Sequence, residues 1–582
     1  MKAILFTSNG VRALGACGWV LGVVLASTGN PLHARPRPTL EISSAADHLA
    51  RGRSLLTAGK NREALAEFLE ACRLEPSSAQ GFILAGIARY QLGEYRDAVL
   101  ALRRAVQLDP ASEAAHYNLA MSLARLKQND EGIRELRSVL ALDPQSTAAH
   151  YNLGVLLEEK GRYEDAIHNF LDVEKIQPGD GATLLHLVTA YYGVGDSQQA
   201  IRLAHEGANN DPKGELAGRL AEIMIRHGDF ESAVRLLEPI RSRAPKSSGV
   251  DVTLARAYLG AGEPRKAIDL LKPAQSGEAS WQIPYLLGLA YVAENQRQSA
   301  IAAFRDATHL GPDQPDPHYR LGGLLLNAPD EADQQTGVTQ VSRAIALEPR
   351  TPEHYEVLGR WFLQHDQLKA AIEILDQGIK DGGPTAELEA MMALALAALH
   401  GGSSAKPFAE RALQLDSGLA LAHYLVGFCL LSAGDYAQAA KYYEQAAELD
   451  LHNDVYSYNT AVALQRLNRL SEALPFAQKS VELNPGRSLN HYFLGKLYSK
   501  LNRDTDAVAE LEASVRLNPE LDNSYYLLAQ IYERSGNATR AQEMRDKLEQ
   551  LKQSRQRMVG IDSPESEPSE MISPSRVLQD HR

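Results

Sequence analysis

The sequence has few cysteines, few aromatic side chains and no excess of positive charge. Only three of 582 residues are cysteine, too few for a disulfide-stapled scaffold or a multi-cysteine zinc domain. Lysine and arginine number 60 against 73 aspartates and glutamates, a formal net charge of −13, which disfavours broad binding to a phosphate backbone. The hydrophobic fraction of 44% and the charged fraction of 23% are near globular averages, so wholesale disorder and collagen-like repetition are excluded.

Long hydrophobic runs are also missing, except near the start of the chain. After a basic beginning, residues 13–27 are nearly all apolar, but this run is too short and too poorly flanked for a convincing membrane span. We interpret residues 1–34 as an export signal, cleaved after Ala26 or Ala34, which predicts a periplasmic or extracellular protein. Two alternatives stay open: an uncleaved signal would be a membrane anchor, and Cys17 lies in a sequence that loosely resembles a lipoprotein box.

A period of 34 residues runs through the rest of the chain. Prolines stand at Pro76, Pro110, Pro144, Pro178 and Pro212, each 34 residues after the one before. Each period contains two stretches with helical spacing of apolar residues, separated by a Gly or Asn that tolerates the left-handed conformation at a helix end. The proline ends the second helix because it cannot continue the hydrogen-bond ladder. The sequence therefore predicts an all-α chain of helix–turn–helix repeats.

Two positions of the repeat carry small side chains. Position 8, on the first helix, is Gly in many repeats, and position 20, on the second helix, is Ala or Gly in fifteen repeats. A larger side chain at position 20 would force the two helices apart. The array defined by this column covers about residues 45–555. The members of the column are Ala64, Ala98, Gly132, Ala166, Ala200, Ala233, Ala267, Ala300, Gly337, Ala371, Ala405, Ala439, Ala473, Ala507 and Ala541.

These columns resemble the tetratricopeptide repeat (TPR) family, whose repeats are small at position 8, Ala at 20, large or aromatic at 24 and Pro at 32. The repeat that begins near His150 is a close match, with Phe170 at position 24 and Pro178 at position 32. The resemblance implies a right-handed superhelical solenoid of about fifteen repeats with a concave groove. In such an array each repeat buries its faces on its neighbours.

Departures from the pattern divide the predicted array. Repeats 1–8 occupy residues 45–314, and repeats 12–15 with a capping helix occupy residues 420–555. Between them, repeats 9–11 in residues 315–419 contain an insertion and lack some terminal prolines. We predict a candidate hinge in this block, and ordinary drift of mid-array repeats is the alternative. Residues 559–582 are rich in Pro, Ser and Glu, which predicts a disordered tail.

No catalytic signature interrupts the array. The sequence has no Walker-type phosphate loop, no Gly-x-Ser-x-Gly elbow and no His-Glu-x-x-His zinc helix. Histidines that precede tyrosine once per repeat are interpreted as a consensus position, too far apart to share a metal. We therefore expect no enzyme activity, no cofactor and no metal site. These histidines are His116, His150, His318, His423 and His491.

Tyrosine and asparagine recur at positions 5 and 6 of the first helix, which line the concave face in the family that the chain resembles. Tyrosine offers rigid, amphipathic contact area, and an asparagine amide offers a donor and an acceptor to a peptide unit. Each ring either lines the groove or packs against the adjacent helix. The asparagines resemble the ladder in the repeat domain of O-linked N-acetylglucosamine transferase, although here the ladder is broken. The candidate peptide-binding residues are Tyr117, Asn118, Tyr151, Asn152, Tyr424, Tyr458, Asn459 and Tyr492.

The sequence thus predicts a non-catalytic, exported scaffold that binds other proteins, in particular extended peptide segments, through its concave groove. The alternative is a periplasmic scaffold for polysaccharide export or envelope assembly, similar to exopolysaccharide-secretion repeat proteins, which would contact a glycan or an outer-membrane channel. Aromatic side chains suit sugars as well as peptides, so the sequence does not separate the two. No nucleic-acid partner is expected. The tail follows the array directly, which leaves open whether it docks on the groove of its own chain.

Overall fold

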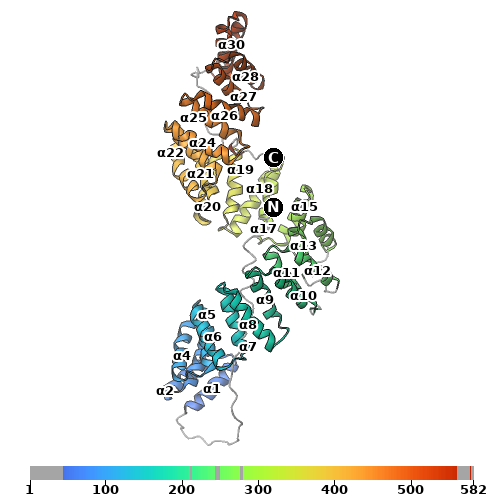
Figure 1. Ribbon diagram of the computed structural model, residues 1–582, viewed down its shortest axis with the longest axis vertical. Coiled ribbons are helices and arrows are strands. Elements are labelled where there is room, and N and C mark those ends of the chain that lie inside the picture. Colours follow the sequence, from blue (N-terminus) through green and yellow to red (C-terminus); the bar gives the residue numbers. More distant parts are fainter. Residues whose placement is uncertain are drawn as a thin grey trace. The chain divides into compact units, whose positions relative to one another are not determined.

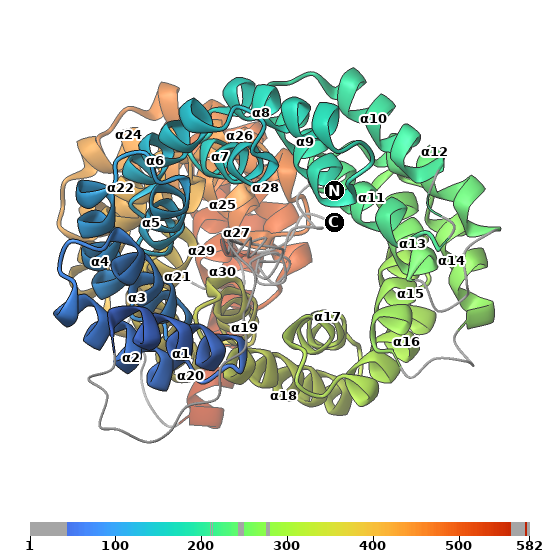
Figure 2. The same ribbon diagram turned by 90° about the horizontal axis from the view of Figure 1, so that it is seen from below.

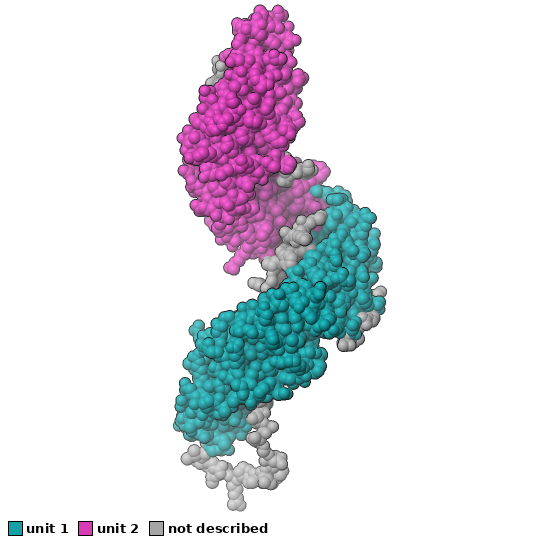
Figure 3. All heavy atoms as spheres, viewed as in Figure 1, with its two compact units in different colours: residues 1–300 teal, residues 301–582 magenta. Residues whose placement is uncertain are grey.

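The computed structural model describes residues 44–209, 211, 213–242, 249–274, 280–559 and 577–578. The described residues form α-helices joined by short turns and contain no strand (Figure 1). By its contacts the chain divides into unit 1, residues 1–300, and unit 2, residues 301–582, coloured separately in Figure 3. The predicted export signal lies outside the described residues. None of the described helices is long and apolar enough to cross a membrane.

The thirty described α-helices pair into fifteen helical hairpins, which confirms the predicted fold class. From the start of unit 1 to its boundary they are α1 (Ala45–Thr57), α2 (Asn61–Leu74), α3 (Ala79–Gln91), α4 (Tyr95–Leu108), α5 (Glu113–Arg125), α6 (Asn129–Leu142), α7 (Thr147–Glu159), α8 (Tyr163–Ile176), α9 (Gly181–Gly193), α10 (Ser197–Asn209), α11 (Glu215–Arg226), α12 (Phe230–Arg241), α13 (Val250–Gly260), α14 (Pro264–Leu271), α15 (Gln282–Ala293) and α16 (Arg297–Leu310). A short 3₁₀ turn, Lys272–Ala274, follows α14.

Helix α16 crosses the boundary at residue 300, and the remaining helices belong to unit 2. They are α17 (Pro315–Leu326), α18 (Glu331–Leu347), α19 (Pro352–Gln364), α20 (Leu368–Asp381), α21 (Ala386–His400), α22 (Gly402–Leu415), α23 (Ala420–Ser432), α24 (Tyr436–Leu449), α25 (Asp454–Arg466), α26 (Leu470–Leu483), α27 (Ser488–Lys500), α28 (Asp504–Leu517), α29 (Asp522–Arg534) and α30 (Ala538–Val559). The first helix of every hairpin therefore has an odd number and the second an even number.

Glycine at position 8 lets the first helix of a hairpin contact the large side chain at position 24 of the second. A Cβ atom on Gly154 would lie 2.6 Å from Cε1 of Phe170, and one on Gly86 would lie 2.5 Å from Cγ of Leu102. Both distances are far below the separation of about 3.5 Å at which carbon atoms attract each other. Phe170 and Leu102 are fully buried by this contact. The glycine column thus fixes the spacing within a hairpin.

The alanine column at position 20 confirms the same close approach from the other helix. Every alanine of this column, from Ala64 to Ala541, exposes at most 1% of its surface. The column holds over both units because each repeat buries its faces only on its neighbours, so the same steric demand returns in every repeat.

The turn between the two helices of a hairpin requires one residue in the left-handed region. Gly93 and Asn295 occupy it with φ values of 79° and 56°, as predicted from their residue types. Lys127 and Asp366 hold the same position with φ values of 59° and 53°, and of the two only lysine is a residue type that seldom adopts this conformation. The repeat geometry therefore overrides local preference in the turn at Lys127.

The insertion in the repeat that begins at Pro315 lengthens a helix. Helix α18 has 17 residues, whereas α4 has 14 at the equivalent place. Further on, Gly401 with φ of 82° lies alone between α21 and α22, so that turn is tighter than its Gly-rich sequence suggests. The block predicted as repeats 9–11 is thus built of regular hairpins, and the hinge in 315–419 stays a prediction.

Within unit 1 the two helices of each hairpin face different sides. The odd-numbered helices α9, α11, α13 and α15 line the inner side of the curve, and the even-numbered α10, α12 and α14 lie on its outer side (Figure 2). The predicted groove positions all lie on odd-numbered helices. The odd-numbered helices are therefore the ones that carry the predicted groove residues.

Candidate functional site

The predicted groove residues of unit 1 lie between consecutive hairpins. Tyr117 and Tyr151 expose 5% and 6% of their surface, and Asn152 exposes none. Asn152 Nδ2 donates to the Tyr117 hydroxyl at 3.0 Å and to a backbone carbonyl of its own helix at 2.8 Å. Asn118 Nδ2 likewise donates to the carbonyl four residues earlier at 2.7 Å. The structure brings Tyr117 and Asn152 together as a contact between repeats, and their binding role stays a prediction.

Burial also fixes the ionisation state of this contact. Loss of hydration raises the pKa of Tyr117 to about 12, although the hydrogen bond from Asn152 acts in the opposite direction. The hydroxyl is therefore neutral at physiological pH and accepts the amide hydrogen bond as an uncharged group.

The predicted residues of unit 2 are distributed in the same way. Tyr424 and Tyr492 are buried, and Tyr458 is partly buried with its ring centroid 5.0 Å from the guanidinium carbon of Arg487. Asn459 Nδ2 donates to the backbone carbonyl of Val455 at 2.8 Å. These side chains pack within and between hairpins, and their role in binding stays a prediction.

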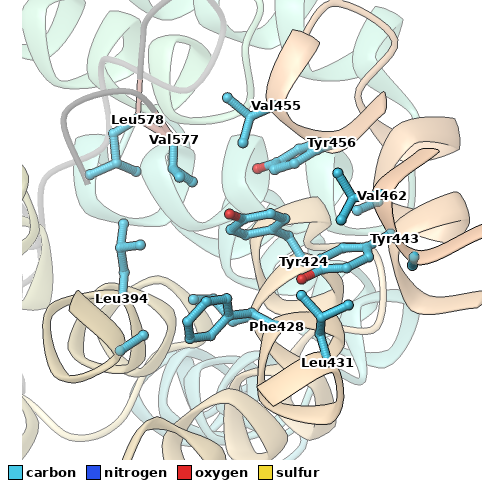
Figure 4. Packing of buried hydrophobic residues seen from close by; sticks show 14 of the residues in the cluster. Leu394, Tyr424, Phe428, Leu431, Tyr443, Val455, Tyr456, Val462, Val577 and Leu578 are labelled. Atoms are coloured by element: carbon cyan, nitrogen blue, oxygen red, sulfur yellow. The ribbon is translucent and has the colours of Figure 1, made fainter. Parts of the chain in front are cut away.

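A hollow of about 240 Å³ lies on unit 2, where the first helices of four successive hairpins come together. Val577 and Leu578 line it, and they expose only 4% and 6% of their surface. Both belong to the apolar cluster of unit 2, in which Figure 4 shows them near Leu394, Val455 and Tyr456. The hollow is also lined by residues of helices α19, α21, α23 and α25 and of the turns before them. Among these are Arg360, Glu387, Met391, Leu421, Asn453 and Tyr456.

Two side-chain amides bind the backbone of this pair. Asn453 Nδ2 donates to the carbonyl oxygen of Val577 at 3.3 Å, and Gln364 Nε2 donates to that of Leu578 at 3.2 Å. The other end of the Asn453 amide, Oδ1, accepts the backbone N–H of Val455 at 3.0 Å and so caps α25. Since every residue type has the carbonyl, these contacts recognise a peptide backbone and not a side chain.

A buried ion pair holds the start of α25, and with it Asn453, in place. The Asp454 side chain is 4% exposed, and its Oδ2 atom accepts from Arg487 Nη1 and from Asn490 Nδ2, both at 2.9 Å. Asn453 and Asp454 are adjacent, so this network restricts the cap residue that contacts Val577. A preorganised donor of this kind loses little freedom when it binds.

Tyrosine rings lie behind the hollow. The Tyr456 and Tyr424 ring centroids are 5.1 Å apart, and those of Tyr424 and Tyr443 are 5.4 Å apart. Desolvation raises the pKa of both Tyr456 and Tyr424, so the rings are neutral. The hollow thus combines apolar, aromatic and charged side chains with the amide of Asn453, and Gln364 binds the tail pair beside it.

The residue pattern of the sequence did not predict a role for Gln364 or Asn453. Gln364 is at position 13 of its repeat, a groove position of the family, but only positions 5 and 6 were singled out by their residue types. Asn453 lies in the turn before α25, outside the helical positions. In the segment predicted to be disordered, Val577 and Leu578 have a defined place, and the structure describes nothing else beyond Val559. The sequence signal for this contact is the presence of two adjacent apolar residues, Val577 and Leu578, in a largely polar tail.

The recurring histidines bond across the boundary between repeats. His116 Nδ1 lies 2.5 Å from Glu135 Oε2, and its Nε2 lies 3.1 Å from the backbone oxygen of Pro110, which ends the preceding repeat. His491 repeats the arrangement with Glu510 at 2.7 Å and Pro485 at 2.9 Å. Within the described ranges no three His, Cys, Asp or Glu side chains lie close enough to hold a metal ion.

Several family models match the chain. Models described as tetratricopeptide repeat match residues 117–181, 224–280, 285–334, 430–488 and 490–521, and a model described as TPR repeat matches residues 86–127. Together the matched ranges cover about half of the sequence. No curated protein matches the sequence in the comparison made.

Among solved structures the chain is similar, at low identity and low TM-score, to several helical proteins. A chain of the APC/C hetero-tetramer Cut9–Hcn1 is 12% identical with a TM-score of 0.36, covering 78% of this chain and 97% of that one. A chain of the Naa15/Naa10 complex bound to HypK-THB is 13% identical with a TM-score of 0.32, covering 92% and 99%. MamA from Desulfovibrio magneticus RS-1 is 24% identical with a TM-score of 0.27, covering 28% and 93%.

The family assignment is based on the repeat models and on the hairpins, and not on these superpositions. The small residues at positions 8 and 20, the left-handed turn residues and the fifteen hairpins agree with the matched models. The chain belongs to the tetratricopeptide repeat family.

Proposed function

We propose that this chain is a non-catalytic scaffold that binds segments of other proteins through the inner faces of its first helices. One observation supports the proposal above all others. In unit 2, Asn453 and Gln364 donate to the backbone carbonyls of two consecutive apolar residues, whose buried side chains line the hollow. This is the chemistry with which a groove recognises a short peptide segment.

The same observation favours a peptide over a glycan as the ligand. The amide donors bind successive peptide carbonyls, and Met391, Leu421 and Tyr456 contribute apolar surface beside them. Sugar hydroxyl oxygens also accept hydrogen bonds from amides, so the apolar contact with Val577 and Leu578 is what favours a peptide.

The proposal includes export to the periplasm or the extracellular space. Its support is the basic start and the apolar run 13–27. Cys72 and Cys429 are buried free thiols, and burial raises the pKa of Cys429 to about 11. A thiol with so little thiolate character resists oxidation, so both residues are compatible with an oxidising compartment.

Capture of proteins by the full chain tests the scaffold. The wild type, N453A/Q364A and the matched control R103A/E131A are each used as bait in an envelope extract. The control removes an exposed ion pair of unit 1, Arg103 with Glu131. We expect specific proteins that the wild type and the control retain and that N453A/Q364A loses. Glycan alone, or the same proteins on all three baits, contradicts the proposed site.

A further inference from the structure

We propose that Val577 and Leu578 are an intramolecular ligand of the hollow on unit 2. The hollow takes in its place a partner segment with two consecutive branched apolar residues, so that partner and tail compete for one site. This inference rests on the function proposed above and adds to it the class of ligand and a means of control. The occupant is a named part of this chain, and its seat is built entirely from unit 2.

Burial and hydrogen bonding act together on the pair. Val577 and Leu578 are as buried as the core of the unit, with 4% and 6% of their surface exposed. Both of their carbonyl oxygens are bound by amides, those of Asn453 and Gln364. The pair is therefore held by the site in the manner of a ligand.

The recognition divides into two parts. The carbonyl contacts fix the position of the backbone and accept any sequence. The apolar surroundings, which include Met391, Leu421 and Tyr456, select the side chains. One basic and two acidic side chains also line the hollow, so its charges select neither sign. A trans ligand of this hollow thus carries two neighbouring branched apolar residues.

The tether makes the tail a strong competitor. Helix α30 ends at Val559, and residues 560–576 connect it to the seated pair. A tethered ligand of this kind has an effective concentration on the order of 1 mM. With an intrinsic Kd of about 100 μM for the tail, a trans peptide therefore binds about tenfold more weakly while the tail is in place.

A labelled peptide tests the competition in the full chain. The probe is a fluorescent peptide of residues 573–582, and fluorescence anisotropy measures its Kd for the wild type, V577D/L578D and S573D/S575D. The last variant adds the same two charges to the tail but leaves the seated pair intact. V577A/L578A, which only truncates the two side chains, serves as a second released variant.

We expect both released variants to bind the probe about tenfold more tightly than the wild type and S573D/S575D. Adding N453A/Q364A to V577D/L578D is expected to abolish the gain. Equal Kd values for the wild type and the released variants overturn the competition, while the proposed scaffold stands on its capture experiment. No binding by either released variant overturns the ligand class. A wild-type dimer that V577D/L578D dissociates in sedimentation assigns the tail to a second copy and overturns the intramolecular contact.

Discussion

The asparagines inside helices of unit 1 and Asn453, which precedes helix α25 of unit 2, use their amides in opposite ways. In unit 1, Asn118 and Asn152 donate to carbonyl groups four residues earlier in their own helices, and Asn152 also bonds to Tyr117. In unit 2, Asn453 uses its oxygen to cap a helix and its nitrogen to bind a carbonyl of the tail. In unit 1 the amide N–H groups bond within the repeats, whereas in unit 2 the amide N–H of Asn453 bonds to the tail.

The difference arises from the place of each residue in the hairpin. An asparagine inside a helix lies one turn above a backbone carbonyl and bonds back to it. An asparagine before a helix satisfies a free N–H with its oxygen, so its NH₂ group points elsewhere. A residue type on a groove-facing helix is therefore a weaker guide to binding than the same residue type at a helix start.

The largest expected effect is a difference in stability: breaking the buried ion pair of unit 2 costs more than breaking the exposed ion pair of unit 1. Asp454→Ala leaves Arg487 buried without its partner, so we expect a loss of about 3 to 5 kcal/mol in the free energy of unfolding. Glu131→Ala breaks the exposed pair with Arg103 and is expected to cost about 0 to 1 kcal/mol. Urea unfolding followed by circular dichroism measures both, and equal costs contradict the role of Asp454.

The next effect concerns the hairpin contact that both units share. Gly154→Ala places a Cβ atom 2.6 Å from Phe170, and Gly427→Ala places one 2.9 Å from Tyr443. We expect losses of about 1 to 3 kcal/mol, larger for Gly154→Ala because the overlap is greater. Gly218→Ala is the control, since nothing lies within 4 Å of its Cβ, and it is expected to stabilise α11 by about 0.5 to 1 kcal/mol. Thermal melts that show three equal shifts would refute the steric argument.

A smaller effect tests the two asparagines directly. Asn152→Ala removes the amide that bonds to Tyr117, and we expect a loss of about 1 to 2 kcal/mol with no change in binding of the tail peptide. Asn453→Ala removes a cap at a cost of about 1 kcal/mol and also weakens peptide binding in the V577D/L578D background. Peptide anisotropy and urea unfolding are measured on the same samples. If Asn152→Ala weakens peptide binding as much as Asn453→Ala, the comparison between the units fails.

The last prediction concerns stability at alkaline pH, and we expect no change in stability at neutral pH. The pKa of Tyr117 in unit 1 and of Tyr355 in unit 2 is raised from 10 to about 12, in both cases mainly by desolvation. The stability that these protonated hydroxyls contribute is complete below pH 10, the unfolded pKa, and is lost as the pH rises to 12. We expect the melting temperature to fall over this interval, and less steeply in Tyr117→Phe. A flat profile would contradict the burial of these hydroxyls.

The fold was accessible from the sequence because each repeat makes the same local demands. Alanine at position 20 and glycine or asparagine at the turn have steric causes that act within one hairpin, so residue types alone reveal them. Lys127 shows the limit of this reasoning, because the repeat geometry imposes a left-handed turn on a residue type that seldom adopts it.

The binding site was less accessible because it joins parts that the sequence keeps far apart. Gln364 and Leu578 are separated by 214 positions, and nothing local to either residue indicates the contact. The direction of an amide also depends on which of its two ends the backbone already uses. The sequence period identifies the helices that line the predicted groove. It does not identify which amide donors on these helices, or in the turns before them, bind a ligand.

The histidine at the start of a repeat has a mechanical consequence. His116 and His491 bond to the loop that closes the preceding repeat and to a carboxylate in the second helix of their own repeat. If a force pulls the chain apart from one end, a hairpin cannot detach until its ring has left the loop of its neighbour. We therefore expect each unfolding step under force to release one hairpin together with the loop before it. The gain in chain length per step would then exceed that of one hairpin alone.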